Sequence, residues 1–157
     1  MAYGYAVGQS DSISGVVIAA DSDVTFDLGA LVFPHAGFTS VPAPSGSQFV
    51  LATSGVYEFD FFVAGTHAAQ ATTPLVFALY RNGAVAAVGG NAFEFRGTLN
   101  PTLAQTCVGH GIIQLTAGDV ITLHNRTNTV TDFVTVTSAP TGVDASPNRT
   151  LALKRIA

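Results

Sequence analysis

Alternate positions along residues 55 to 63 of this chain form two sets of different character. Successive side chains of a strand point to opposite faces, so this stretch is predicted to be a strand with two different faces. The uniformly apolar face is expected in a core and consists of Tyr57, Phe59, Phe61 and Val63. The other face mixes carboxylates with apolar groups: Val56, Glu58, Asp60 and Phe62. A mixed face of this kind suits a sheet that another subunit partly covers.

The rest of the chain shows short β-rich runs between Gly, Pro, Ser and Asp clusters, without sustained helical spacing. This pattern predicts an all-β sandwich. The segment 34–47 contains three prolines and two glycines and is expected to be a long loop. The segment 24–33 is expected to hold one or two short strands, broken near Gly29. The other expected strands are 2–8, 14–19, 48–53, 55–64, 75–81, 84–88, 93–95, 103–116, 120–126, 133–138 and 150–156.

Two hairpins are expected from turn residues between strand-like runs. Asn82-Gly83 is the strongest short hairpin signal in the chain. The loop Ala117-Gly118-Asp119 is expected to pair 103–116 with 120–126. Matching the apolar faces of these two runs would place Leu115 opposite Ile121 and Ile113 opposite Leu123.

Length and charge narrow the class of protein. A chain of 157 residues fits one domain, 1–157, and can bury a core without a disulfide or metal. Charged residues make up only 10%, against about 25% in typical domains, so the surface is either uncharged or covered in an oligomer. The net charge is −4 and the six basic residues are scattered, which argues against nucleic-acid binding. No apolar run is long enough for a transmembrane helix, and no secretory signal is visible at Met1.

Two groups of residues could ligate a metal. The register above would make His110 and His124 diagonal neighbours, but they lack a third ligand, so hydrogen-bonded or exposed histidines are the favoured interpretation. Asp21, Asp23 and Asp27 could suit calcium, but closely spaced aspartates at a strand entry are more often turn residues.

No catalytic motif is found. The chain has no Gly-x-Ser-x-Gly elbow, no marked Cys/His pairing and no glycine-rich phosphate loop opening a helix, so neither an enzyme nor a cofactor is expected. The single cysteine, Cys107, lies in an apolar run and shares the parity of Ile113 and Leu115. It is predicted to be a buried small hydrophobe.

The motif Gly55-Val56-Tyr57-Glu58-Phe59 resembles the corresponding strand of the tumour necrosis factor-like jelly rolls, which include the globular heads of the complement q subcomponent. Three further features occur in the same order as in that family. They are Phe49 with the turn Thr53-Ser54-Gly55, the segment 115–123, and the final strand 151–157. Low charge, richness in Ala, Val and Thr, and the Asn82-Gly83 hairpin make the chain look most like bacterial members. Among these are the C-terminal domain of the Bacillus exosporium collagen-like glycoprotein BclA and its basal-layer relatives.

The resemblance implies a two-sheet antiparallel jelly-roll sandwich of about ten strands that forms a homotrimer. The first and last strands and the strand at 55–64 would lie in the sheet that faces the threefold axis. The trimer interface is then expected to include Glu58, Asp60, Phe62 and Lys154. Lys154 should leave the final strand on the same side as the two carboxylates and form a partly buried ion pair with one of them, within or between chains.

The resulting interpretation is a non-enzymatic trimeric head in a bacterial surface or exosporium layer, which works in trimerisation and display, with other surface-layer proteins as further partners. The alternative is a receptor- or carbohydrate-binding module, such as a lectin or a phage-fibre tip. For a lectin the candidate ligand residues are Asn91, Phe93, Arg96 and Asn100.

Overall fold

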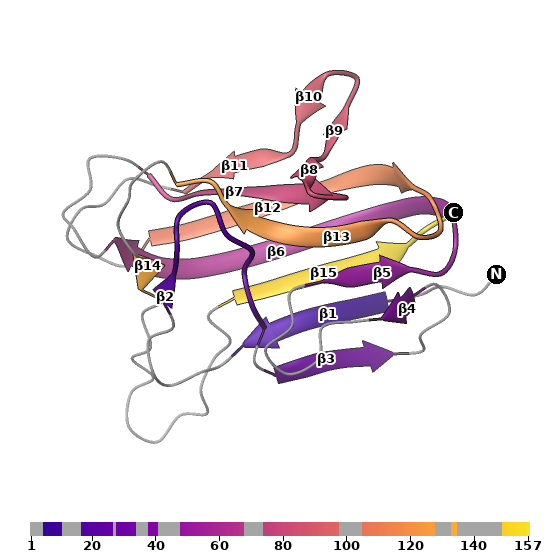
Figure 1. Ribbon diagram of the computed structural model, residues 1–157, viewed down its shortest axis with the longest axis horizontal. Coiled ribbons are helices and arrows are strands. Elements are labelled where there is room, and N and C mark those ends of the chain that lie inside the picture. Colours follow the sequence, from indigo (N-terminus) through magenta and orange to yellow (C-terminus); the bar gives the residue numbers. More distant parts are fainter. Residues whose placement is uncertain are drawn as a thin grey trace.

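The computed structural model describes residues 5–10, 17–26, 28–33, 38–40, 48–67, 74–97, 105–127, 133–134 and 149–157. In these segments every regular element is a β-strand, and the strands form two packed layers (Figure 1). No helix within them is long and apolar enough to cross a membrane.

The first sheet contains seven strands. They are β1 (Tyr5–Ser10), β2 (Val17–Ile18), β3 (Leu28–Phe33), β6 (Gly55–His67), β12 (Gln105–Leu115), β14 (Phe133–Val134) and β15 (Arg149–Arg155). The order is β2-β14-β6-β15-β1-β3, and β12 also pairs with β6. The central strand β6 is antiparallel to both β12 and β15. The final strand and the strand at 55–64 therefore lie in one sheet, as the family resemblance implies, and they pair directly with Lys154 opposite Glu58.

The second sheet contains six strands. They are β4 (Phe38–Ser40), β5 (Phe49–Leu51), β7 (Val76–Arg81), β8 (Ala84–Val85), β11 (Glu94–Arg96) and β13 (Val120–Asn125). The order is β11-β7-β13-β5-β4, with β8 pairing with β7. Strands β9 (Ala87–Val88) and β10 (Asn91–Ala92) form a separate hairpin that projects beyond the two layers in Figure 1. Ten strands of the described segments have three or more residues, which agrees with the expected number.

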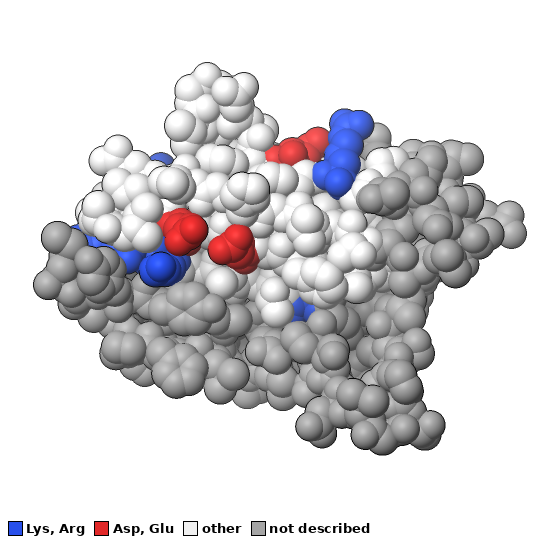
Figure 2. Space-filling view, turned by 180° about the vertical axis from the view of Figure 1, so that it is seen from behind, with Lys and Arg blue, Asp and Glu red and all other residues white. Residues whose placement is uncertain are grey.

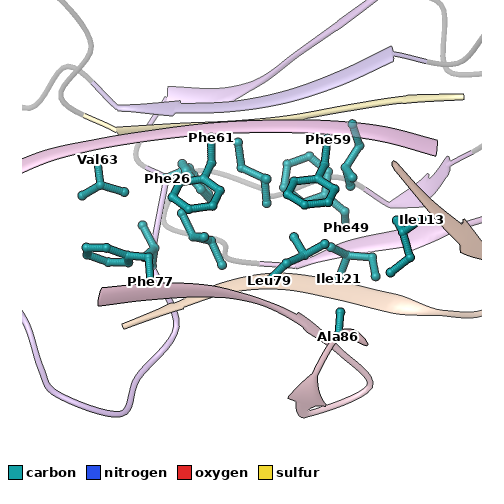
Figure 3. Packing of buried hydrophobic residues seen from close by; sticks show 14 of the residues in the cluster. Phe26, Phe49, Phe59, Phe61, Val63, Phe77, Leu79, Ala86, Ile113 and Ile121 are labelled. Carbon is teal, nitrogen blue, oxygen red and sulfur yellow. The ribbon is translucent and has the colours of Figure 1, made fainter. Parts of the chain in front are cut away.

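The apolar face of β6 fills the space between the layers. Tyr57, Phe59, Phe61 and Val63 are at most 3% exposed, which confirms the period-two prediction. Figure 3 shows the β6 side chains facing Phe77, Leu79 and Ile121 of the second sheet, with Phe26 and Phe49 among them.

Two glycines of β12 make room for the aromatic part of this core. A Cβ at Gly109 would overlap the Phe61 ring and come within 2.6 Å of the Phe95 ring. A Cβ at Gly111 would come within 2.8 Å of the Phe59 ring. The vacated space allows edge-to-face contacts between Phe61 and Phe95, with ring centroids 5.3 Å apart, and between Phe59 and Phe95 at 6.2 Å.

Cys107 lies on the same inward face of β12 and is fully buried, as predicted. Burial raises the pKa of its thiol to about 11, because the thiolate would lose its hydration there. The thiol sulfur lies 3.4 Å from the carbonyl oxygen of Phe95. The cysteine therefore acts as a packing group at this position.

The Asn82-Gly83 hairpin is confirmed. Strands β7 and β8 pair directly across it, with Arg81 opposite Ala84. Asn82 and Gly83 have φ of 53° and 79°, the left-handed region that a type I′ turn requires at both central positions.

The second expected hairpin is wrong. Strand β12 pairs with β6 in the first sheet, whereas β13 pairs with β5 and β7 in the second. The turn at 117–119 therefore crosses from one sheet to the other. Ile113, Leu115, Ile121 and Leu123 all point into the core, but they do so from opposite layers. The alternation of side chains along each strand fixes which of them point inward. That alternation is the same whether the two strands pair in one sheet or face one another across a core.

This crossing turn is held by one buried carboxylate. Asp119 accepts hydrogen bonds from the backbone nitrogen of Thr116 at 2.7 Å and from Asn82 Nδ2 at 2.8 Å, and it forms an ion pair with Arg81 at 2.8 Å. Burial alone would raise the pKa of Asp119. The donors from Thr116, Asn82 and Arg81 outweigh that effect and hold the pKa below its ordinary value of 3.8.

Two smaller expectations hold only in part. Gly29 lies inside strand β3, but the pairing of β3 with β1 shifts register between Leu28 and Leu31, so the irregularity expected near Gly29 is in the ladder and does not end the strand. The expected loop 34–47 contains the short strand β4, which pairs with β5, while 34–37 and 41–47 lie outside the described residues. Backbone pairing at the sheet edge sets these two elements, and side-chain periodicity over so few residues does not report it.

Replacing Gly109 by alanine is expected to lower the free energy of unfolding by about 1–3 kcal/mol, since the added methyl would displace packed aromatic rings. Gly111→Ala should cost less, because its Cβ would approach the Phe59 ring less closely. Denaturant unfolding followed by circular dichroism measures both. A Gly109→Ala variant as stable as the wild type would contradict this account of the core.

Replacing Asp119 by asparagine is expected to cost about 2–3 kcal/mol, because charge-assisted hydrogen bonds are lost. The pKa of Asp119 is lower in the folded than in the unfolded chain, so its stabilisation is present above about pH 4 and is lost as the pH falls through the folded pKa. The variant should therefore lose less stability than the wild type on acidification. Glu94→Gln is the matched control, because it removes one negative charge whose ion pairs are 3.8 and 4.0 Å long. Equal acid sensitivity of wild type and Asp119→Asn would contradict the assignment.

Candidate functional site

A segment from the beginning of the chain lies along the last half of β13. The backbone nitrogen of Val24 donates to the Leu123 carbonyl at 2.7 Å, and the nitrogen of Asn125 donates to the Ser22 carbonyl at 2.9 Å. The side chain of Asn125 is buried and donates to the carbonyls of Ile18 and Ala19. Residues 18–24 are thus fixed as a strap beside β13, which makes the position of two aspartates definite.

The strap brings these two aspartates to one histidine. His124 Nδ1 lies 3.0 Å from Asp23 Oδ1, and His124 Nε2 lies 3.1 Å from Asp21 Oδ1. Asp21 adopts a φ of 55°, a left-handed conformation that aspartate tolerates better than most residues. That turn separates the two carboxylates enough for each to meet a different ring nitrogen.

The two carboxylates lie on opposite sides of the imidazole ring of His124. A neutral imidazole has one N–H and can donate to one carboxylate, whereas the imidazolium can donate to both. The hydrogen bond and the charge of His124 lower the pKa of Asp21, and Arg126 adds to the effect through an ion pair of 3.4 Å. Asp21 therefore contacts two side chains, His124 and Arg126, whereas Asp23 contacts His124.

Tyr80 of β7 completes the site from the neighbouring strand. Its ring stacks on the ring of His124, with centroids 4.1 Å apart and planes 20° from parallel. Thr122 lies opposite Tyr80 in the register and on the same outward face as His124. A half-open cleft of about 350 Å³ lies over this part of the second sheet. Its lining comprises Asp21, Ser22, Asp23, Gln48, Tyr80, Gly83, Val120, Thr122 and His124.

The structure does not bring the two histidines together as the expected hairpin register predicts. His124 is not a neighbour of His110. His110 lies on the outer face of β12 opposite Asp60, in the other sheet. Asp21 and Asp23 meet His124 instead, while Asp27 lies outside the described residues. No group of three or more His, Cys, Asp or Glu side chains in the described segments is arranged to hold a metal ion.

The contact between the strap and His124 was missed by sequence reasoning. The partners are about a hundred positions apart, and neither a shared motif nor a period joins them. The aspartates were recognised as turn residues, and Asp21 does sit in a turn, but the identity of their partner depends on where β13 lies in the fold.

The expected interface residues lie together on the outer face of the first sheet. We call this surface the β6 outer face, and it comprises Val56, Glu58, Asp60, Phe62, Val108, His110, Ile112, Ala152 and Lys154. Ile112, Glu58 and Lys154 lie side by side across three strands. Val108 and Ile112 are 61% and 58% exposed, although both are large apolar side chains. Figure 2 shows that few charged side chains occur on this side of the described surface.

The expected ion pair is present but not buried in the isolated chain. Lys154 Nζ lies 3.9 Å from Glu58 Oε2, and the two side chains are 51% and 45% exposed. An ion pair of this length and exposure contributes at most about 1 kcal/mol to stability. The predicted partial burial would require a neighbouring molecule.

The lectin candidates do not form an exposed aromatic platform. The ring of Phe93 packs edge-on against Phe59, with centroids 5.0 Å apart, at the border of the core. Asn91 and Arg96 are exposed on β10 and β11, and Asn100 lies outside the described residues. Phe93 is therefore a packing residue.

Comparisons with known proteins show similarity at the level of structure. No protein-family model matches the chain, and no curated protein matches it. Among solved structures, the chain resembles Eiger TNF from S. frugiperda with a TM-score of 0.68 and 14% identity, covering 100% of this chain and 94% of that one. Murine APRIL at pH 5.0 has a TM-score of 0.63 and 14% identity, with coverage of 99% and 100%. The globular domain of zebrafish complement 1qA has a TM-score of 0.54 and 13% identity, with coverage of 97% and 92%.

Identities this low show the fold and leave the function open. The shared architecture extends over nearly the whole chain in all three comparisons. The two-sheet antiparallel sandwich predicted from the sequence is thereby confirmed: the chain has a TNF-like jelly-roll fold.

Proposed function

We propose that the chain is a non-enzymatic jelly-roll head that assembles into a homotrimer through the β6 outer face. The observation that carries this proposal is the exposure of Val108 and Ile112 on one sheet face, with the half-buried Phe62 directly beside Val108. Exposed apolar groups gathered on one face favour contact with another protein surface.

A second copy of the same chain is the occupant that fits this face. Its apolar positions lie beside Glu58, Asp60 and Lys154, so the face carries charges of both signs. In a threefold ring one part of this face contacts a different part of the same face on the next copy, and charges of both signs allow the two parts to be complementary. A charged fraction of only 10% over the whole chain also favours an assembly that covers part of the surface.

Threefold symmetry and a place in a bacterial surface layer follow from the sequence resemblance. The order of the 55–59 motif, the 115–123 segment and the final strand supports a TNF-like head, and the low charge supports a relative of BclA in the exosporium. A composition with one cysteine, one methionine and no tryptophan suits an exposed and durable protein. In this role the head nucleates the trimer and displays its outer surface to the surroundings.

Sedimentation equilibrium at micromolar concentration is expected to give three times the monomer mass. Ile112→Asp should raise the trimer dissociation constant at least about tenfold, because it places an unpaired charge in an apolar contact. Ala87→Asp, on the exposed hairpin strand β9, is the matched control and should remain trimeric. Circular dichroism checks that both variants fold, which is expected because both sites are exposed. A monomeric wild type, or an Ile112→Asp variant that assembles normally, would overturn the proposed interface.

The surface location is tested separately on intact cells and spores of the source organism. An antibody raised against the folded head should label them without permeabilisation, with a deletion strain as the control. Signal that appears only after permeabilisation would place the protein inside and reject the display function, while leaving the trimer result unaffected.

A further inference from the structure

We propose that the cleft beside His124 binds a single neutral sugar unit through the hydroxyl groups of Thr122 and Tyr80 and the carboxylates of Asp21 and Asp23. This inference goes beyond trimer formation. The cleft lies on the second sheet, whereas the β6 outer face belongs to the first.

Two largely buried residues of the cleft carry hydroxyl groups that have no partner within the protein. Thr122 is 7% exposed and Tyr80 is 9% exposed, and both line the cleft. Neither hydroxyl makes a hydrogen bond in the described part of the chain. Among all the residues that the structure describes, Arg155 Nε is the one fully enclosed side-chain polar atom without a partner. The oxygens of Thr122 and Tyr80 are therefore reachable from outside, and the cleft is the opening that both of them line.

Both oxygens are open to the cleft, so a ligand that occupies the cleft can hydrogen-bond to them. Such a ligand must reproduce the hydrogen bonds of the water that it displaces, or affinity is lost. Each hydroxyl can donate one hydrogen bond and accept others. The two groups thus suit a ligand that itself carries both donors and acceptors.

The charges around the cleft favour a neutral ligand. Asp21 already contacts His124 and Arg126, and Asp23 contacts His124, so an added ammonium would compete with resident partners. An anion would face two carboxylates at the same edge. A neutral polyol avoids both penalties and can use the remaining lone pairs of the carboxylates as acceptors.

The size and rigidity of the site fit one sugar ring. A volume of about 350 Å³ is near the lower end for small-molecule sites. The strap holds Asp21 and Asp23 against His124, and the stacked Tyr80 ring holds the imidazole from the other side. The polar groups are therefore fixed before a ligand arrives, which lowers the entropy lost on binding.

The test is a titration of the ¹⁵N-labelled chain with glucose, galactose, mannose and N-acetylglucosamine, each added alone. One of these sugars is expected to shift the backbone amide signals of Asp23, Thr122 and His124 saturably, with a millimolar dissociation constant. Thr122→Val and Tyr80→Phe remove only the hydroxyl groups and should each weaken binding about three- to tenfold. Thr106→Val, an exposed site on β12 of the other sheet, is the matched control and should bind like the wild type.

Three outcomes would overturn the proposal. The first is that none of the sugars shifts these amides at concentrations up to about 100 mM, well above a millimolar dissociation constant. The second is that ethylammonium or methyl phosphate shifts them while the sugars do not, which would make the ligand charged. The third is that both hydroxyl variants bind a sugar as tightly as the wild type. Melting temperatures of the variants separate a lost contact from a damaged fold, and the wild-type titration decides the question even if one variant unfolds.

Discussion

The closure of this sandwich depends on the contact between phenylalanine rings and the backbone of β12. Phe59 and Phe61 reach over the glycines at 109 and 111, where any side chain would occupy the volume of the rings. Phe95 enters the same space from the second sheet and meets both rings edge to face. Aromatic groups bury large areas and gain from this geometry, so a few side chains join the two layers over much of their length.

The alternation of side chains along β6 also produces the β6 outer face. Because β6 is central and its neighbours run antiparallel to it, every inward aromatic residue is followed by an outward residue on the β6 outer face. Burial of Phe59 and Phe61 thus places Glu58, Asp60 and Phe62 side by side with residues of β12 and β15. The core and the proposed interface are two consequences of one alternation.

The second sheet has a different relation between core and surface. The strap at 18–24 lies beside the last half of β13 and pairs with it through backbone hydrogen bonds, so it extends this sheet. The strap supplies Asp21 and Asp23, β13 supplies Thr122 and His124, and β7 supplies Tyr80. Segments distant in the chain therefore build one polar cleft, to which none of them contributes more than three residues.

The amino-acid sequence by itself determined the properties that depend on near neighbours. Alternation assigned Tyr57 and Phe59 to the core, the parity of Cys107 predicted its burial, and Asn82-Gly83 specified a tight hairpin. The class of fold followed from the order of such elements. These features could be predicted because strand periodicity and turn conformation are set within a few residues.

Only the tertiary structure decided which strands pair and which side chains meet. Apolar faces at 103–116 and 120–126 predicted a hairpin, yet the two strands lie in opposite sheets, because a face directed at a core can be covered from either layer. His124 consequently meets Asp21 and Asp23, while His110 lies on the far sheet. Inward direction is a local property of a strand, whereas the choice of partner depends on chain crossings that no short pattern records.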